Sequence, residues 1–215
     1  PAPKILIDQP AIAVQYQLNR LSADDLARLE RRPDDPRYRL VYLALLSRRG
    51  IDPAVRDEAL KVLVTMERAT PARVLLEAMG NVPDGDLVSG DKLVAMLLAL
   101  PRTDLIRERA SFVQEVEKPN TAWPIRSALA ALYVVDAATL DELKLAGGVG
   151  TTPDALYAFR TLPQGPEGQE IRNKAFSYLA GALSAPLAGT APLDATAAPA
   201  IDALGWTNRD ATTFG

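Results

Sequence analysis

"IDPAVRDEALKVLV", Ile51 to Val64, is the stretch that decides the fold of this chain. Asp52 is a good helix N-cap, and Pro53 suits the first helical position, where an N–H would have no partner. Behind this start, apolar residues recur at three- and four-residue steps, and charged residues occupy the other face. The apolar residues are Val55, Ala59, Leu60, Leu63 and Val64. The stretch therefore predicts an amphipathic helix whose apolar face packs against a neighbouring helix.

Part of this stretch returns later in the chain as a β-branched residue, an arginine and, a few places on, an alanine. It occurs as Val55-Arg56 with Ala59, as Ile171-Arg172 with Ala175, and more loosely as Ile125-Arg126 with Ala128. In a stack of helices the β-branched residue and the alanine face the partner helix, and the arginine can reach neighbouring carbonyls or carboxylates. The pattern favours repeated helix pairs, although such pairs also recur by chance in a helical chain rich in Arg and Ala.

Helix signals dominate the rest of the chain, and no segment has the alternating pattern of a β-strand. Cap residues mark several helix starts, namely Asp8, Ser22, Asp52, Thr70 and Thr103, and Gly50 is placed to end one. The expected helices cover residues 10–20, 22–32, 37–49, 53–64, 71–80, 91–100, 104–118, 124–136, 139–146, 153–162, 169–185 and 193–204, with a loop at 81–90. The sequence therefore predicts an all-α fold, an α-solenoid of antiparallel helix pairs that is irregular in part.

We expect residues 1–215 to form one α-helical repeat domain. Residues 1–50 are heavily charged and suit a terminal cap, because an end repeat needs a polar outer face. Residues 51–185 hold the repeats. Residues 186–215 are rich in Ala, Thr and Pro and predict a truncated or open repeat.

Four residues are candidates for an interaction surface. Ile201, Leu204 and Trp206 belong to an apolar set that the last helix would leave uncovered, so we expect another domain or subunit to cover them, or the native chain to continue past Gly215. Trp123 lies at a helix boundary, where an aromatic side chain can anchor a partner or fill the gap between two repeats.

Composition excludes several kinds of function. The chain has no Cys and no His, so it cannot form a disulfide, a Cys/His zinc site, a thiolate nucleophile or a Ser-His-Asp triad. Lys and Arg number 24 against 27 Asp and Glu, and a net charge of −3 gives no broad surface for nucleic acid. The sequence also lacks the run of about 18 apolar residues that a membrane span needs. We expect no cofactor, no metal and no membrane insertion.

In a chain without Cys and His, paired carboxylates could still act as a general acid and a general base. The pairs are Asp24/Asp25, Asp34/Asp35, Asp57/Glu58 and Asp141/Glu142. Adjacent residues on a helix point about 100° apart, so such a pair cannot flank one substrate bond as a glycosidase pair does. We expect solvated faces and helix caps at these positions. The missing catalytic residue types favour a non-catalytic scaffold, and a helical carbohydrate-active enzyme or lyase that uses Asp and Glu from different helices is the alternative.

The segment "DPAVRDEALKVL", residues 52–63, resembles the second helix of a HEAT-type repeat, with its Asp/Pro start, Val-Arg, alanine and leucine. Residues 5–51 and "AIDALGWTNRDATTF", residues 200–214, resemble HEAT-like modules of large exported bacterial proteins that also carry cupredoxin-like or c-type cytochrome-like domains. The resemblance covers most of the chain. It implies a protein-protein interaction module in an exported, electron-transfer-associated protein. Together with Pro1 in place of Met, it implies an extracytoplasmic (periplasmic or secreted) location after removal of a signal peptide.

Overall fold

The computed structural model describes residues 3–83, 85–118, 120–134, 159, 165–166, 169–187, 204–205 and 207. All regular secondary structure in these residues is helical, and they contain no β-strand, which confirms the all-α class predicted from the sequence. The chain divides into two compact units, Pro1–Asp104 and Leu105–Gly215. The expectation of one repeat domain over residues 1–215 stays a prediction.

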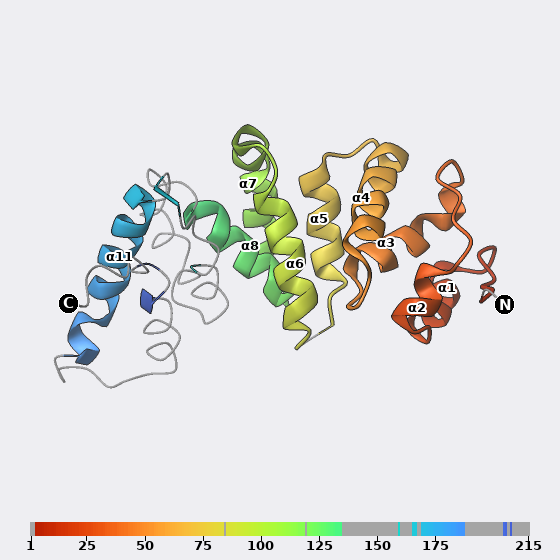
Figure 1. The fold of residues 1–215 in the computed structure, drawn as a ribbon, viewed down its shortest axis with the longest axis horizontal. Helices are drawn as coiled ribbons and strands as arrows, with labels where there is room; N and C mark the ends of the chain where they lie inside the picture. The colour runs from red at the N-terminus through yellow and green to blue at the C-terminus, as the bar shows by residue number, and fades with distance from the viewer. Residues whose placement is uncertain are drawn as a thin grey trace. The chain divides into compact units, whose positions relative to one another are not determined.

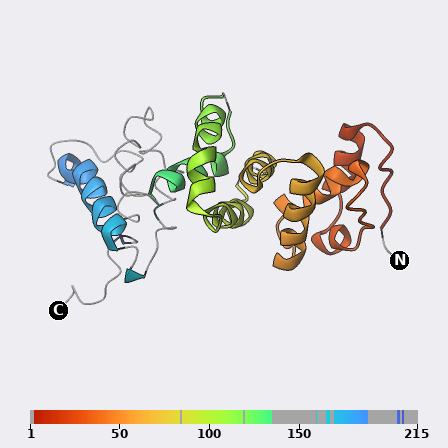
Figure 2. The same ribbon diagram turned by 90° about the horizontal axis from the view of Figure 1, so that it is seen from above.

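Helix α3 lies at the centre of the first unit. The unit begins with α1 (Ala11–Asn19), α2 (Ala23–Ala27) and a short 3₁₀ helix, η1 (Pro36–Tyr38). The helices α3 (Arg39–Ser47), α4 (Pro53–Glu67), α5 (Pro71–Gly80) and α6 (Leu87–Leu98) follow. Each of α3, α4 and α5 packs against the next helix along the chain, and α3 also contacts α1, α2, η1, α5 and α6 (Figure 1, and from above in Figure 2).

The sequence of α3 explains its central position. It reads "RLVYLALLS" and has apolar residues on every side, as a helix surrounded by other helices requires. Its buried side chains include Tyr42, Leu45 and Leu46, each fully enclosed. Fully burying one such side chain stabilises the fold by roughly 1.5–3 kcal/mol.

The predicted helix starts at Asp52 and Thr70 are confirmed. The Asp52 carboxylate accepts a hydrogen bond from the Ala54 N–H at 2.8 Å, and the Thr70 hydroxyl accepts one from the Arg73 N–H at 3.3 Å. Each cap precedes a proline at the first helical position. Gly50 adopts the left-handed conformation, with φ +83°, two residues after the C-cap of α3.

Helix α1 differs from its prediction at the first turn. Its N-cap is Pro10, whose side chain makes no capping bond, so the prediction of Asp8 as the cap is wrong. The Asp8 carboxylate instead pairs with the Arg37 guanidinium, with Oδ1 and Nη1 2.7 Å apart. An ion pair between segments distant in sequence has therefore replaced the local cap.

Helix α6 begins earlier than predicted, at Leu87 rather than Asp91, so the loop expected at 81–90 is shorter. The Asp86 carboxylate accepts hydrogen bonds from the Ser89 N–H at 3.1 Å and from the Ser89 hydroxyl at 2.7 Å. The first of these two hydrogen bonds satisfies an N–H of the first turn, as a helix start requires. Thr103 was also expected to cap a helix, and it lies inside α7 instead.

The second unit contains α8 (Trp123–Val134), α11 (Gln169–Leu187) and most of α7 (Arg102–Val116). In α7, Leu105 and Phe112 share a buried face. The Arg109 guanidinium of α7 lies 5.1 Å from the centroid of the Tyr133 ring of α8. The buried ring of Phe159 stacks on Tyr178 of α11, with the ring centroids 6.1 Å apart.

We expect removal of the Tyr42 hydroxyl to leave the first unit as stable as before, or more stable by up to about 1 kcal/mol. The ring is fully buried, and the hydroxyl forms no hydrogen bond within the described part of the chain. Burial, helped by the nearby Glu58 charge, raises the pKa of this hydroxyl. Urea unfolding of Tyr42→Phe and Tyr42→Ala checks this, because the alanine variant loses the ring and about 3–5 kcal/mol. A large loss in the phenylalanine variant would contradict the expectation.

Candidate binding cavity of the first unit

A cavity of about 420 Å³ opens in the first unit between α1, α3 and the turn that joins α5 to α6. Its volume falls in the range of small-ligand sites, roughly 300–1,000 Å³. The floor is one face of α3, formed by Leu40, Leu43, Ala44 and Ser47. Their three- and four-residue spacing places them on the same side of the helix. The floor is therefore mainly apolar.

The walls of the cavity are more polar than its floor. Gln15 and Asn19 of α1 form one wall, and Asn81 and Asp86 of the α5–α6 turn form the other. The Gln15 side-chain amide donates a hydrogen bond to Asn81 Oδ1 at 3.4 Å, so the two walls are bridged at the rim. This bond is longer than the usual 2.7–3.2 Å and is correspondingly weak.

Arg48, after the end of α3, also lines the cavity and fixes its α1 wall. Its guanidinium donates to the Leu21 carbonyl at 2.9 Å and to the Leu18 carbonyl at 3.1 Å. Carbonyls at the end of a helix have no partner inside the helix, and a cation there also complements the helix dipole. Arg48 is thus a side-chain cap for the carboxyl end of α1.

Arg56 of α4 holds the segment that carries Arg48. Its side chain is only 3% exposed, and its guanidinium donates to the Leu46 carbonyl and, at 2.7 Å, to the Arg48 carbonyl. Burial lowers the pKa of Arg56, and the negative charge of Asp86 opposes this effect. An arginine keeps its proton even so, because a guanidinium is by far the strongest base among the side chains.

The two other arginines of the sequence pattern occupy the same helical position. Arg56, Arg126 and Arg172 are each the fourth residue of their helix, in α4, α8 and α11. Arg126 donates to the Thr121 carbonyl, and Arg172 donates to the Gly165 carbonyl at 2.8 Å. Each arginine therefore bonds a carbonyl that precedes its own helix. This confirms the expectation that these side chains reach neighbouring carbonyls.

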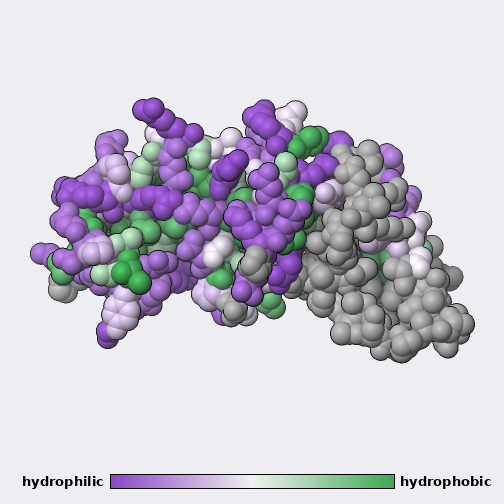
Figure 3. Space-filling model, turned by 180° about the vertical axis from the view of Figure 1, so that it is seen from behind, coloured by the Kyte–Doolittle hydropathy of each residue, from purple (hydrophilic) through white to green (hydrophobic). Residues whose placement is uncertain are grey.

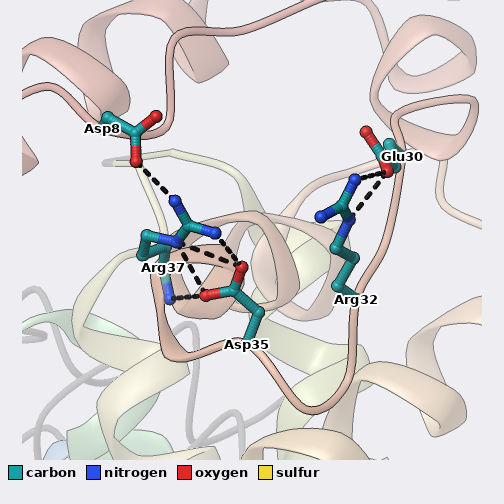
Figure 4. Close-up of polar contacts among 5 residues, drawn as sticks. All are labelled: Asp8, Glu30, Arg32, Asp35 and Arg37. Atoms are coloured by element: carbon teal, nitrogen blue, oxygen red, sulfur yellow. Dashed lines mark hydrogen bonds and ion pairs between the residues drawn. The ribbon is translucent and has the colours of Figure 1, made fainter.

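Carboxylates near the amino end serve as caps and ion-pair partners (Figure 4). Asp35 caps η1 and pairs with Arg37, whose guanidinium lies between the carboxylates of Asp35 and Asp8. The hydrogen bond from Arg37 lowers the pKa of Asp35, and the hydrogen bond from Arg32 lowers the pKa of Glu30. These contacts confirm the predicted cap at Asp35, although its side chain is only 19% exposed and so less solvated than expected.

Two carboxylates from different helices meet at Arg39. Glu67 of α4 lies 2.8 Å from Arg39 Nε, and Glu77 of α5 lies 2.6 Å from Arg39 Nη2. The burial of Arg39 acts to lower its pKa, but its bonds to Glu77 and Glu67 outweigh that effect and raise it. Because one guanidinium bonds both carboxylates, the arrangement links the first residue of α3 to α4 and α5.

Of the four residues predicted for an interaction surface, the described part of the chain contains Trp123 and Leu204. Trp123 is 9% exposed in the second unit, which suits the gap-filling role considered for it. Leu204 is half-buried, and the neighbouring Thr207 donates a hydrogen bond to its carbonyl at 2.8 Å. Ile201 and Trp206 lie outside the described residues. A partner at these four positions stays a prediction.

The cavity itself has no signature in the sequence, because its lining comes from three separate segments. The one available signal is the occurrence of carboxamides at Gln15, Asn19 and Asn81.

On the face drawn in Figure 3, hydrophilic side chains dominate the described surface and hydrophobic ones form scattered patches.

Comparison of the chain with protein-family models, curated proteins and solved structures gave no match. Among the described residues, no three or more Asp or Glu side chains cluster in a way that could hold a metal ion. The described helices are also too short or too polar to span a membrane.

We expect the pKa of Asp35 to rise when Arg37 is replaced by methionine. The folded-state pKa of Asp35 lies below its unfolded value of about 4, so its ion pair stabilises the fold above that pH and is lost as the pH falls through the folded value. NMR titration of the carboxyl carbon in the parent and in Arg37→Met measures this shift. A titration curve that is the same in both proteins would show that the ion pair is absent in solution.

Proposed function

We propose that the chain is a non-catalytic HEAT-like repeat module that binds another domain or subunit of a larger exported protein associated with electron transfer. One observation carries this proposal. Arg56, Arg126 and Arg172, at the fourth position of three helices, all bond carbonyls of the segment before the helix. A repeated side chain with a repeated bond is what repeated structural units would produce.

The connections between helices also support a repeat arrangement. Residues 48–52 join α3 to α4, and residues 68–70 join α4 to α5. Connections this short favour antiparallel neighbours, as in the helix pairs of a solenoid. The alanine of the pattern is also buried in both close copies, at Ala59 and Ala175, where a small side chain permits close helix packing.

We expect Arg56→Met to destabilise the protein by about 2–4 kcal/mol, because it leaves the buried Leu46 carbonyl and the partly buried Arg48 carbonyl without this donor. Arg49→Met is the matched control, since Arg49 is exposed in the turn between α3 and α4. Its effect on the free energy of unfolding should stay within about 0.5 kcal/mol. Urea unfolding followed by circular dichroism measures both values. Equal stability of the two variants would mean that the buried bonds contribute nothing measurable.

We expect the packing substitution Ala59→Leu to loosen only its neighbours. In a repeat array each unit contacts adjacent units alone, so amide exchange should accelerate in α3, α4 and α5 while α8 and α11 stay protected. Ala54→Leu, on the exposed side of the first turn of α4, should change none of them. Hydrogen exchange read by mass spectrometry distinguishes this result from a uniform loss of protection, which would contradict the repeat proposal.

The non-catalytic part of the proposal has its own test. The purified chain should release no reducing ends from a panel of plant, bacterial and fungal polysaccharides. Activity that survives purification and disappears on a single Asp→Asn or Glu→Gln substitution would contradict the proposal, because a scaffold has no essential carboxylate.

A further inference from the structure

We propose that the cavity between α1, α3 and the α5–α6 turn binds an extended, uncharged peptide segment of the partner protein. Side-chain amides on the walls would bond the main chain of this segment, and the α3 floor would hold one of its aliphatic side chains. This inference rests on the proposed scaffold function, since it names the kind of partner that the scaffold takes. Three properties of the cavity support it.

The first property is the set of carboxamides on the walls, Gln15, Asn19 and Asn81. A carboxamide has both a donor and an acceptor, as a peptide unit does, so the two can form paired hydrogen bonds. Within the described residues, the Asn19 amide nitrogen and the Gln15 side-chain oxygen take part in no hydrogen bond, and the Gln15–Asn81 bond is long at 3.4 Å. The Asn81 amide nitrogen already donates to the Glu77 carbonyl at 2.9 Å. The bonding capacity that a peptide main chain would use therefore lies on the α1 wall, at Gln15 and Asn19.

The second property is the absence of a usable charge in the lining. The two charged residues, Arg48 and Asp86, have opposite signs. The guanidinium of Arg48 bonds the carbonyls at the end of α1, and both carboxylate oxygens of Asp86 bond Ser89. An ionic ligand would compete with these structural bonds, whereas a dipolar, uncharged ligand would not.

The third property is the apolar surface that continues beyond the cavity. Leu40, Leu43 and Ala44 offer a floor for one aliphatic side chain. On α1, Ile12 is 82% exposed and Tyr16 is 63% exposed, and both lie within one helical turn of Gln15. A ligand that fills the cavity and also covers these side chains must be longer than the cavity, which favours a polypeptide over a small molecule.

The probe is the capped peptide acetyl-Ser-Leu-Ser-amide, titrated into the ¹⁵N-labelled chain and followed by NMR. We expect saturable shifts of the Leu43 and Ala44 amides and of the Gln15, Asn19 and Asn81 side-chain amides. Ala44→Phe fills the cavity and should weaken binding about tenfold or more, and Gln15→Leu should weaken it about fivefold. Gln9→Leu, an exposed glutamine before α1, is the matched control and should bind as the parent does.

Several results would overturn the inference. These are no saturable shift, shifts that persist in both Ala44→Phe and Gln15→Leu, and equal binding of isocaproate or maltose, which share the hydrocarbon or the polarity of the probe but not its amides. Circular dichroism shows whether Ala44→Phe folds. If that variant does not fold, the peptide affinity of Gln15→Leu, a substitution at an exposed position, decides between the outcomes. The titration could show no binding while Ala59→Leu accelerates amide exchange only in the neighbouring helices. That pair of results would reject the peptide site and still support the scaffold function.

Discussion

The first unit depends on the bonds from the buried Arg56 side chain to the carbonyls of Leu46 and Arg48. These bonds satisfy the end of α3 and fix the turn that follows it, and the same turn carries Arg48, whose own guanidinium satisfies the end of α1. Arg56 thus connects α4 to α3, and Arg48 connects the end of α3 to α1. A charge is expensive to bury, so such a side chain persists only where several fixed acceptors surround it.

This arrangement accounts for the position of the cavity. Arg48 bonds the carboxyl end of α1, and α1 forms one wall of the cavity over the face of α3 that carries Leu40, Leu43 and Ala44. The turn between α5 and α6 closes the other side, and Asp86 anchors that turn by capping α6 through Ser89. The cavity is therefore bounded by helix ends and turns that are each held by their own hydrogen bonds. A binding site formed this way needs no large rearrangement to accept a ligand.

Much of the fold could be predicted because local rules decide it. The starts at Asp52 and Thr70 follow from a cap residue and a proline that are adjacent in sequence. One helix start was predicted wrongly where a distant residue competed, because Asp8 pairs with Arg37 and does not cap α1. The start of α6 was predicted too late although its cap is local, since Asp86 bonds Ser89 three residues on. The cavity could not be predicted at all, because its three walls come from segments whose apposition only the tertiary packing determines.

The arginine pattern predicts a structural feature although each of its residues is common. A Val-Arg or Ile-Arg pair alone predicts little, but a guanidinium at the fourth position of a helix can reach back over the first turn to the preceding carbonyls. At that position its aliphatic stem lies along the apolar face, so burial of the stem and bonding of the head favour the same placement. Arg56 and Arg172 are both 3% exposed and both bond in this way, although the residues that accept their bonds differ. The three helix starts share a geometry, and the sequence shows this geometry only through the arginine at the fourth helical position.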